Sequence, residues 1–151
     1  MRALDRRRPI SSSWRWAASL ALLILANCSL PDVGETSAND TGRLVPIEAG
    51  RFIGLRCIGR GSPTVILESG FGADSGAWYA VQPKVARQTR VCAYDRAGIG
   101  YSDVGPMPRD GAAIARDLDQ VLKAADIKGP YILVGHSAGG LYARLFAARR
   151  P

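Results

Sequence analysis

Hydrophobic residues between positions 43 and 151 fall into short apolar runs that are separated by glycine, proline and polar residues. Their length and their content of β-branched residues predict strands. The predicted strands are Leu44–Glu48, Phe52–Ile58, Thr64–Glu68, Arg90–Tyr94 and Tyr131–Val134. Most of these runs lack polar and apolar alternation, which predicts strands that are buried on both faces of a sheet.

Helical periodicity separates the later strands. Asp110–Ala125 places Ile114, Leu118, Val121 and Leu122 on one helical face, with Asp110 as the predicted N-cap. Shorter helical stretches cover Gln82–Gln88 and Leu141–Arg150. Strands that alternate with helices predict an α/β protein, with a mostly parallel sheet and helices on both faces. Ligands of such folds bind at the carboxyl ends of the strands.

The N-terminus has the features of an export signal. Basic residues Arg6–Arg8 precede an apolar run at Trp16–Ala26. That run is shorter than the roughly 20 residues that span a bilayer. Residues 1–30 are therefore predicted to be an export signal or a retained membrane anchor, which predicts a periplasmic or extracellular protein that contacts the membrane through this segment.

A cysteine at the end of the apolar run is a candidate lipidation site. Leu25-Ala26-Asn27-Cys28 resembles the lipobox of bacterial lipoproteins, but Asn27 stands where that pattern has Gly, Ala or Ser. Lipidation of Cys28, simple secretion and an uncleaved anchor therefore all stay open.

Residues 31–42 are small and polar, which predicts a flexible linker, and a single folded domain is expected over residues 43–151. The chain carries a net charge of +7, of which five arginines and one aspartate place +4 within residues 1–27. Because the basic excess belongs mostly to the N-terminal segment, no nucleic-acid partner is predicted.

Cys57 and Cys92 form an even pair in a chain that is predicted to enter an oxidising compartment, so a disulfide is one interpretation. Two unbridged, buried cysteines are favoured, because neighbouring parallel strands rarely offer bridging geometry.

One histidine and three scattered cysteines provide no metal-ligand cluster. No metal or cofactor is predicted.

The segment Gly135-His136-Ser137-Ala138-Gly139 lies between a predicted strand and a predicted helix, which is typical of a nucleophile elbow. Gly135 and Gly139 are expected to relieve crowding in the sharp turn, and Gly140 to let the helix pack closely. Ser137 is the candidate nucleophile. The backbone N–H of Ala138 is expected to point at the oxygen that becomes negative in a tetrahedral intermediate.

His136 is the one histidine of the sequence. Adjacent side chains diverge in an elbow turn, so His136 is poorly placed to take the proton of Ser137. It is predicted to support the elbow by packing and hydrogen bonding, together with Gly135 and Gly139.

Three segments in this order resemble the α/β-hydrolase superfamily, and they are Thr64–Gly72, Ala93–Asp103 and Gly129–Gly140. The resemblance runs from about Arg43 to Pro151, which corresponds to the N-terminal half of that fold, ending with the helix after the elbow. It implies that the loop Ser69–Gly72 supplies a second oxyanion N–H, from Phe71. Without the family, Gly70 and Gly72 are equally well explained as turn residues.

By the same resemblance, the stretch Asp95–Ser102 is a structural turn beside the active site. Trp78 and Tyr79 are candidates to line the mouth of the pocket, but both are expected to be packed aromatic residues. Superfamily members that open epoxides or displace halide use aspartate where this chain has Ser137. Hydrolysis of a small-molecule ester is the leading prediction. Peptide, amide, thioester or lactone cleavage and cofactor-free haloperoxidase chemistry stay open.

The triad order of this fold is Ser, then Asp or Glu, then His, so the two partners of Ser137 are expected beyond Pro151. Asp95, Asp103 and Asp110 precede the serine and are not candidates. The chain alone is therefore expected to be inactive and to expose the apolar edge of its last strand, as a fragment of a longer exported hydrolase. The alternative is a membrane-tethered, non-catalytic binding module with an inherited elbow.

Overall fold

The computed structural model describes residues 42–150. The predicted export signal, Cys28 and nearly all of the predicted linker lie outside these residues. Within the described part of the chain, no helix is both long enough and apolar enough to cross a membrane.

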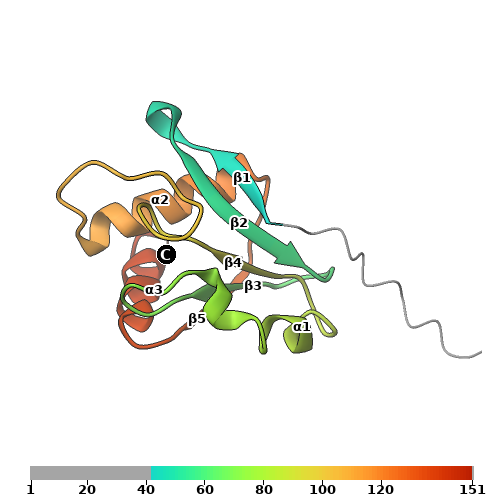
Figure 1. Ribbon diagram of the computed structural model, residues 1–151. Helices are drawn as coiled ribbons and strands as arrows, with labels where there is room; N and C mark the ends of the chain where they lie inside the picture. Colours follow the sequence, from blue (N-terminus) through green and yellow to red (C-terminus); the bar gives the residue numbers. More distant parts are fainter. Residues whose placement is uncertain (1–41, 151) are drawn as a thin grey trace, which may run out of the picture. The chain divides into compact units, whose positions relative to one another are not determined.

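Five strands form one mixed sheet in the order β1-β2-β4-β3-β5 (Figure 1). Their bounds are β1 (Arg43–Pro46), β2 (Phe52–Ile58), β3 (Thr64–Glu68), β4 (Val91–Tyr94) and β5 (Tyr131–Gly135). Strand β3 pairs in parallel with both β4 and β5. Strands β1 and β2 pair antiparallel, and so do β2 and β4. The predicted α/β class is confirmed, but the sheet is mixed rather than mostly parallel, because two of its four strand pairings are antiparallel.

Three α-helices accompany the sheet, and they are α1 (Gln82–Val85), α2 (Gly111–Ala124) and α3 (Ala138–Ala148). Asp110 caps α2 as predicted, because its carboxylate accepts a hydrogen bond from the Ala113 amide at 2.8 Å. Helix α1 ends three residues earlier than the predicted stretch. Helix α3 begins three residues earlier than predicted, so that Ser137 lies directly at its N-terminus.

Helices cover both faces of the sheet. Ile66 of β3 packs in one core with Leu118 of α2 and Phe146 of α3. Its neighbours Val65 and Leu67 point to the opposite face, where they pack with Trp78 of the 3-10 helix Ser75–Trp78. This arrangement explains why β3 is apolar without alternation, and it confirms that Trp78 is a packed aromatic residue. The same expectation is wrong for Tyr79, whose side chain is 76% exposed.

Cys57 and Cys92 form a disulfide. The prediction of two unbridged cysteines is therefore wrong. It assumed parallel neighbours, whereas β2 and β4 pair antiparallel and place Cys57 directly opposite Cys92, with their Cα atoms 4.0 Å apart. Directly opposed residues of antiparallel strands bring their Cβ atoms close together, which permits the bridge.

Strand β5 lies at one edge of the described sheet. Ile132 and Val134 of this strand are exposed, and so are Leu141 and Leu145 of the adjoining helix α3. An unpaired strand with apolar side chains is a surface on which further chain can pair. The predicted apolar edge is thus present in the described residues.

Candidate active site

Three loops lie together at the carboxyl ends of β4, β3 and β5, because these three neighbouring strands run in parallel (Figure 1). Ser69–Gly72 follow β3, Asp95 and Arg96 follow β4, and His136 and Ser137 follow β5. These loops and Ala138, the first residue of α3, contain all the residues for which the sequence predicts a role in the reaction.

Ser137 has the backbone geometry of an elbow. Its φ is 53° and its ψ is −125°, so it is a non-glycine residue in a sparsely populated conformation. Two short turns hold it there, from the Gly139 amide to the His136 carbonyl at 2.9 Å and from the Gly140 amide to the Ser137 carbonyl at 3.0 Å. The serine is exposed at the carboxyl end of β5.

The two glycines of the motif are sterically required. A Cβ atom on Gly135 would lie 2.5 Å from backbone atoms of Gly139 and Gly140. A Cβ atom on Gly139 would overlap the carbonyl oxygen of Glu68. The expectation for Gly140 is wrong, because a Cβ atom there would meet nothing within 4 Å. Close packing of α3 against β3 therefore depends on Gly139.

The loop after β3 lies against the elbow. A Cβ atom placed on Gly70 would be 3.4 Å from the Cβ atom of Ser137 and 3.1 Å from Nδ1 of His136. The amides of Phe71 and Ala138 donate no hydrogen bond to another described residue. The Phe71 side chain is 87% exposed, so what this residue can offer the elbow is its backbone.

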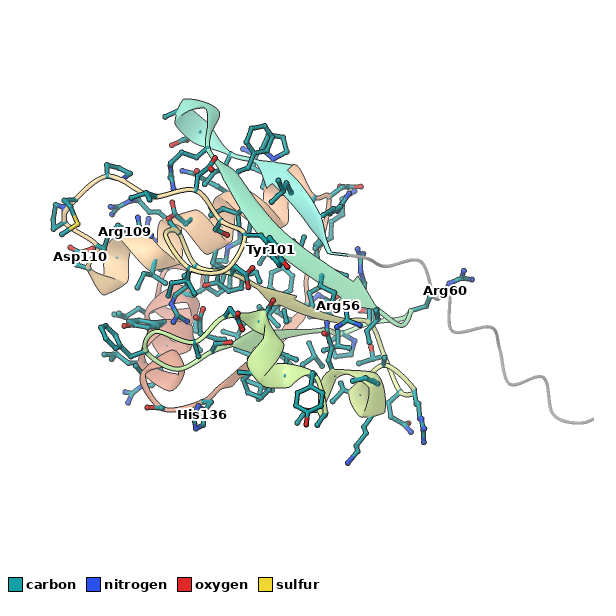
Figure 2. All side chains as sticks on the ribbon, viewed as in Figure 1. Arg56, Arg60, Tyr101, Arg109, Asp110 and His136 are labelled. Carbon is teal, nitrogen blue, oxygen red and sulfur yellow. A yellow bond between two sulfur atoms is a disulfide. The ribbon has the colours of Figure 1, made fainter. Side chains whose placement is uncertain are left out.

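The His136 side chain is exposed and points away from the body of the domain (Figure 2). It makes no hydrogen bond to another described residue. Its backbone does support the elbow, since the His136 amide donates to the Glu68 carbonyl at 3.0 Å. The hydrogen bond that His136 supplies to the elbow thus comes from its main chain, while its imidazole lies against Gly70 without a hydrogen bond to another described residue.

A buried polar network beside the elbow was not anticipated from the sequence. Glu68, Tyr94 and Arg96 are all at most 5% exposed. Arg96 donates to Glu68 Oε1 at 2.7 Å, and the Tyr94 hydroxyl donates to Glu68 Oε2. The available signal was a pair of opposite charges, because Glu68 ends one apolar strand and Arg96 follows the next one closely in the chain.

Burial raises the pKa values of two groups in this network, Glu68 and Tyr94. Desolvation raises the pKa of Glu68, while hydrogen bonds from Tyr94 and Arg96 oppose that rise. Burial, followed by the charge and the hydrogen bond of Glu68, raises the pKa of Tyr94 well above 10.0. The network therefore keeps the Tyr94 phenol protonated.

Aspartates that precede the serine hold turns. Asp95 accepts from the amides of Ser75 at 2.7 Å and Tyr101 at 3.0 Å. Asp103 accepts from the Phe52 amide at 2.8 Å, and Asp110 caps α2. These contacts agree with the interpretation of Asp95–Ser102 as a structural turn.

Two surface cavities lie elsewhere. One of about 780 Å³ is lined by β1, β2 and loop residues that include Asp95 and Tyr101, and one of about 310 Å³ is lined by Cys57, Arg60 and Arg90 with two glycines. Neither includes Ser137 or Phe71 in its lining.

Among residues 42–150, no group of three or more His, Cys, Asp or Glu side chains could hold a metal ion.

Comparison with known proteins agrees with this geometry. The family model of the alpha/beta hydrolase fold matches residues 63–151. The chain belongs to this family, which confirms the resemblance seen in the sequence.

Individual relatives share the same region. The uncharacterized protein YqjL of Bacillus subtilis is 34% identical over 91 residues, which cover 60% of this chain and 36% of YqjL. The putative carbamate hydrolase RutD of Azorhizobium caulinodans is 35% identical over 95 residues, or 62% of this chain and 34% of RutD. This chain thus spans about a third of the length of these two relatives.

A solved structure of a hydrolase from Pseudomonas aeruginosa superposes with a TM-score of 0.67 and 26% sequence identity. The match covers 75% of this chain and 43% of that structure. The fold described above therefore corresponds to part of a larger hydrolase domain.

Proposed function

We propose that this chain is the N-terminal portion of an exported serine hydrolase that acts on carboxylic esters or related acyl substrates. The observation that carries the proposal is the conformation of Ser137, at φ 53° and ψ −125°, beside the loop after β3. Strain of this kind at the end of a parallel strand favours a serine that is raised toward a substrate.

In the proposed reaction, the Ser137 hydroxyl oxygen attacks the acyl carbon while its proton passes to a histidine base. The carbonyl oxygen becomes an oxyanion, which the backbone amides of Ala138 and Phe71 stabilise by hydrogen bonds. The alcohol then leaves with the proton, and water hydrolyses the acyl-enzyme. Both amides lack a partner among the described residues, which supports their assignment as oxyanion donors.

The acid and base of the triad are proposed to lie in the part of the whole protein that this chain does not span. Two relatives support this assignment, because the matched region makes up only 36% of the length of one and 34% of the length of the other. The described carboxylates Asp95, Asp103 and Asp110 are already engaged in turns and a helix cap. By this account, the chain alone lacks the proton acceptor that activates Ser137.

The proposed substrate is a small molecule with an activated acyl carbon. The name of RutD, a putative carbamate hydrolase, adds carbamates to the acyl classes that merit testing. Residues 1–30 are proposed to direct the protein to the periplasm or the cell exterior, either as a cleaved signal or as an anchor.

The experiment is hydrolysis of p-nitrophenyl acetate by the natural protein that carries this chain, expressed from its whole reading frame. We expect Ser137→Ala to reduce kcat by at least about a thousand-fold, because the nucleophile is lost. His136→Gln should retain most of the activity, because its exposed imidazole is not the base. Turnover that survives Ser137→Ala would contradict the proposal.

The same experiment tests the alternative of a non-catalytic binding module. A module with an inherited elbow would show no turnover of any acyl substrate, and Ser137→Ala would change nothing. An expressed protein that ends at residue 151 and still hydrolyses the ester would instead contradict the assignment of the base to a later segment.

A further inference from the structure

Arg96 donates hydrogen bonds to the loop after β3, which contains Phe71, the proposed second oxyanion donor. One terminal nitrogen, Nη1, donates to Glu68 Oε1 at 2.7 Å and to the Ser69 carbonyl at 2.6 Å. The other, Nη2, donates to the carbonyl of Gly70 at 2.5 Å and to that of Ala73 at 3.3 Å. Three carbonyls of one short loop thus converge on a single guanidinium group.

Arg96 fixes the direction of the Phe71 amide together with the Ala73 amide, which donates to the same Gly70 carbonyl at 3.2 Å. The C=O and the N–H of a trans peptide unit point in opposite directions, and the Gly70–Phe71 bond is not among the cis peptides of the described residues. Because the Gly70 carbonyl points to Arg96, the N–H of Phe71 must point away from it. The same reasoning turns the Gly70 N–H away from Arg96, since the Ser69 carbonyl is held as well.

The guanidinium group is itself locked in place. Glu68, which is 2% exposed, binds Arg96 on one carboxylate oxygen and the Tyr94 hydroxyl on the other. The ring of Tyr142 from α3 lies 5.3 Å from the guanidinium carbon. Arg96 therefore has a defined position before any substrate binds, which is what a preorganised oxyanion site requires.

A planar guanidinium group suits this task. Its nitrogens lie in a rigid fork and can bond carboxylate and carbonyl groups in several directions at once. A lysine ammonium group has one nitrogen and cannot occupy both positions of the fork. Two further hydrogen bonds hold the same loop, because Trp78 Nε1 donates to Ser69 Oγ at 2.9 Å and Ser69 Oγ donates to the Asp74 carbonyl at 2.8 Å.

We propose that Arg96 is a positioning residue that orients the Gly70–Phe71 peptide so that the Phe71 N–H faces the oxyanion formed at Ser137. Glu68 binds Arg96 directly and is itself bound by the Tyr94 hydroxyl, so that these two residues keep the Arg96 side chain in position. The inference rests on the proposed hydrolase function, and it assigns to Arg96 an effect on transition-state stabilisation without direct contact with substrate.

The test compares Arg96→Lys with Arg51→Lys in the natural protein expressed from its whole reading frame. Arg51 is a matched control, because both of its terminal nitrogens also bind a buried carboxylate, that of Asp117. Within the described part of the chain, its side chain donates no hydrogen bond to residues 69–73. In Arg96→Lys, we expect kcat to fall about ten- to a hundred-fold with KM within about two-fold. Inhibition by a trifluoromethyl ketone, which forms an oxyanion adduct, should weaken in parallel with kcat/KM.

A second measurement does not depend on catalysis. Phe71 is preceded by glycine, whereas Phe52 and Phe146 are not. Labelling with carbonyl-¹³C glycine and ¹⁵N phenylalanine therefore selects the Gly70–Phe71 peptide group within this chain. We expect its ¹⁵N relaxation to report a rigid amide in the wild type and in Arg51→Lys, and a mobile amide in Arg96→Lys.

The outcomes separate the two proposals. Full kcat and a rigid Phe71 amide in Arg96→Lys, beside a wild type whose turnover depends on Ser137, would overturn the role of Arg96 alone. A wild type without Ser137-dependent turnover would overturn the proposed function and this inference with it. Loss of kcat in Arg51→Lys equal to that in Arg96→Lys would show a purely structural effect and would also overturn the inference.

Discussion

The amide of His136 donates a hydrogen bond of 3.0 Å to the carbonyl oxygen of Glu68. This bond joins the turn after β5 to the last residue of β3. It brings the elbow beside the loop Ser69–Gly72, although the two segments are far apart in the sequence. The juxtaposition of Ser137 with the proposed second oxyanion donor depends on this pairing of neighbouring strand ends.

Replacement of Gly139 by alanine should destabilise the fold by at least about 2 kcal/mol, because the new Cβ atom overlaps the Glu68 carbonyl oxygen. Gly140→Ala is the matched control, one residue further along the same helix with open space around its Cβ position. It should stabilise the protein by up to about 1 kcal/mol, since alanine is the better helix former. Urea unfolding measures both values, and equal effects would contradict the packing described for α3.

Reduction of the disulfide should lower stability. The bridge between Cys57 and Cys92 closes a loop with a sequence separation of 35 residues, and such bridges contribute about 2–4 kcal/mol. A thermal melt with and without a reducing agent measures the loss. The double variant Cys57→Ala, Cys92→Ala should melt at a lower temperature that no longer responds to reductant. Mass spectrometry of unreduced tryptic peptides that found both thiols free would contradict the bridge.

Asp117 is a buried charge with two arginine partners. It is 4% exposed, and it pairs with Arg51 at 2.7 Å and with Arg109 at 2.6 Å. Asp117→Asn should cost about 3 kcal/mol, because both arginines lose their counter-charge in a poorly solvated site. Asp119→Asn is the control on the same helix, where the pair with Arg150 is exposed to solvent and should matter little. Chemical denaturation of the two variants compares the costs.

Stability should fall as the pH rises above about 10. The folded state raises the pKa of Tyr94 well above 10.0, chiefly by burial, so above pH 10 the folded protein holds a proton that the unfolded chain has released. The free energy of unfolding should then decrease by about 1.4 kcal/mol per pH unit for this one proton. Tyr94→Phe should remove that part of the slope, whereas Tyr101→Phe, which changes an exposed residue, should not. An unchanged slope in Tyr94→Phe would contradict the buried network.

Local patterns were enough to predict much of the fold. Asp110 before an amphipathic stretch indicated the N-cap of α2, and the glycine spacing around Ser137 indicated the strand, turn and helix of the elbow. Such features depend on neighbours within a few residues, so the sequence contains the information for them.

Pairings between distant segments were harder to predict. The disulfide was missed because nothing near Cys57 or Cys92 reveals that β2 pairs antiparallel with β4. The hydrogen bonds from Arg96 to the loop after β3 were not predicted either. They form because β4 and β3 are neighbours in the sheet, and no residue near Arg96 in the sequence reveals that order. For Gly140 the sequence predicted a packing requirement that the structure does not have. Gly139 must be a glycine because a Cβ atom there would overlap Glu68, but its neighbour Gly140 has open space at its Cβ position.

The most direct test of the account is to map the adduct formed by a fluorophosphonate on the natural protein that carries this chain. Peptide mass spectrometry should find the adduct on Ser137 and none on Ser69, Ser75 or Ser102, because among these four described serines only Ser137 has the elbow conformation and adjacent unpaired amides. Stoichiometric labelling of Ser137 is the predicted result. A protein that leaves Ser137 unmodified while it hydrolyses acyl substrates would contradict the assignment of this serine as the nucleophile.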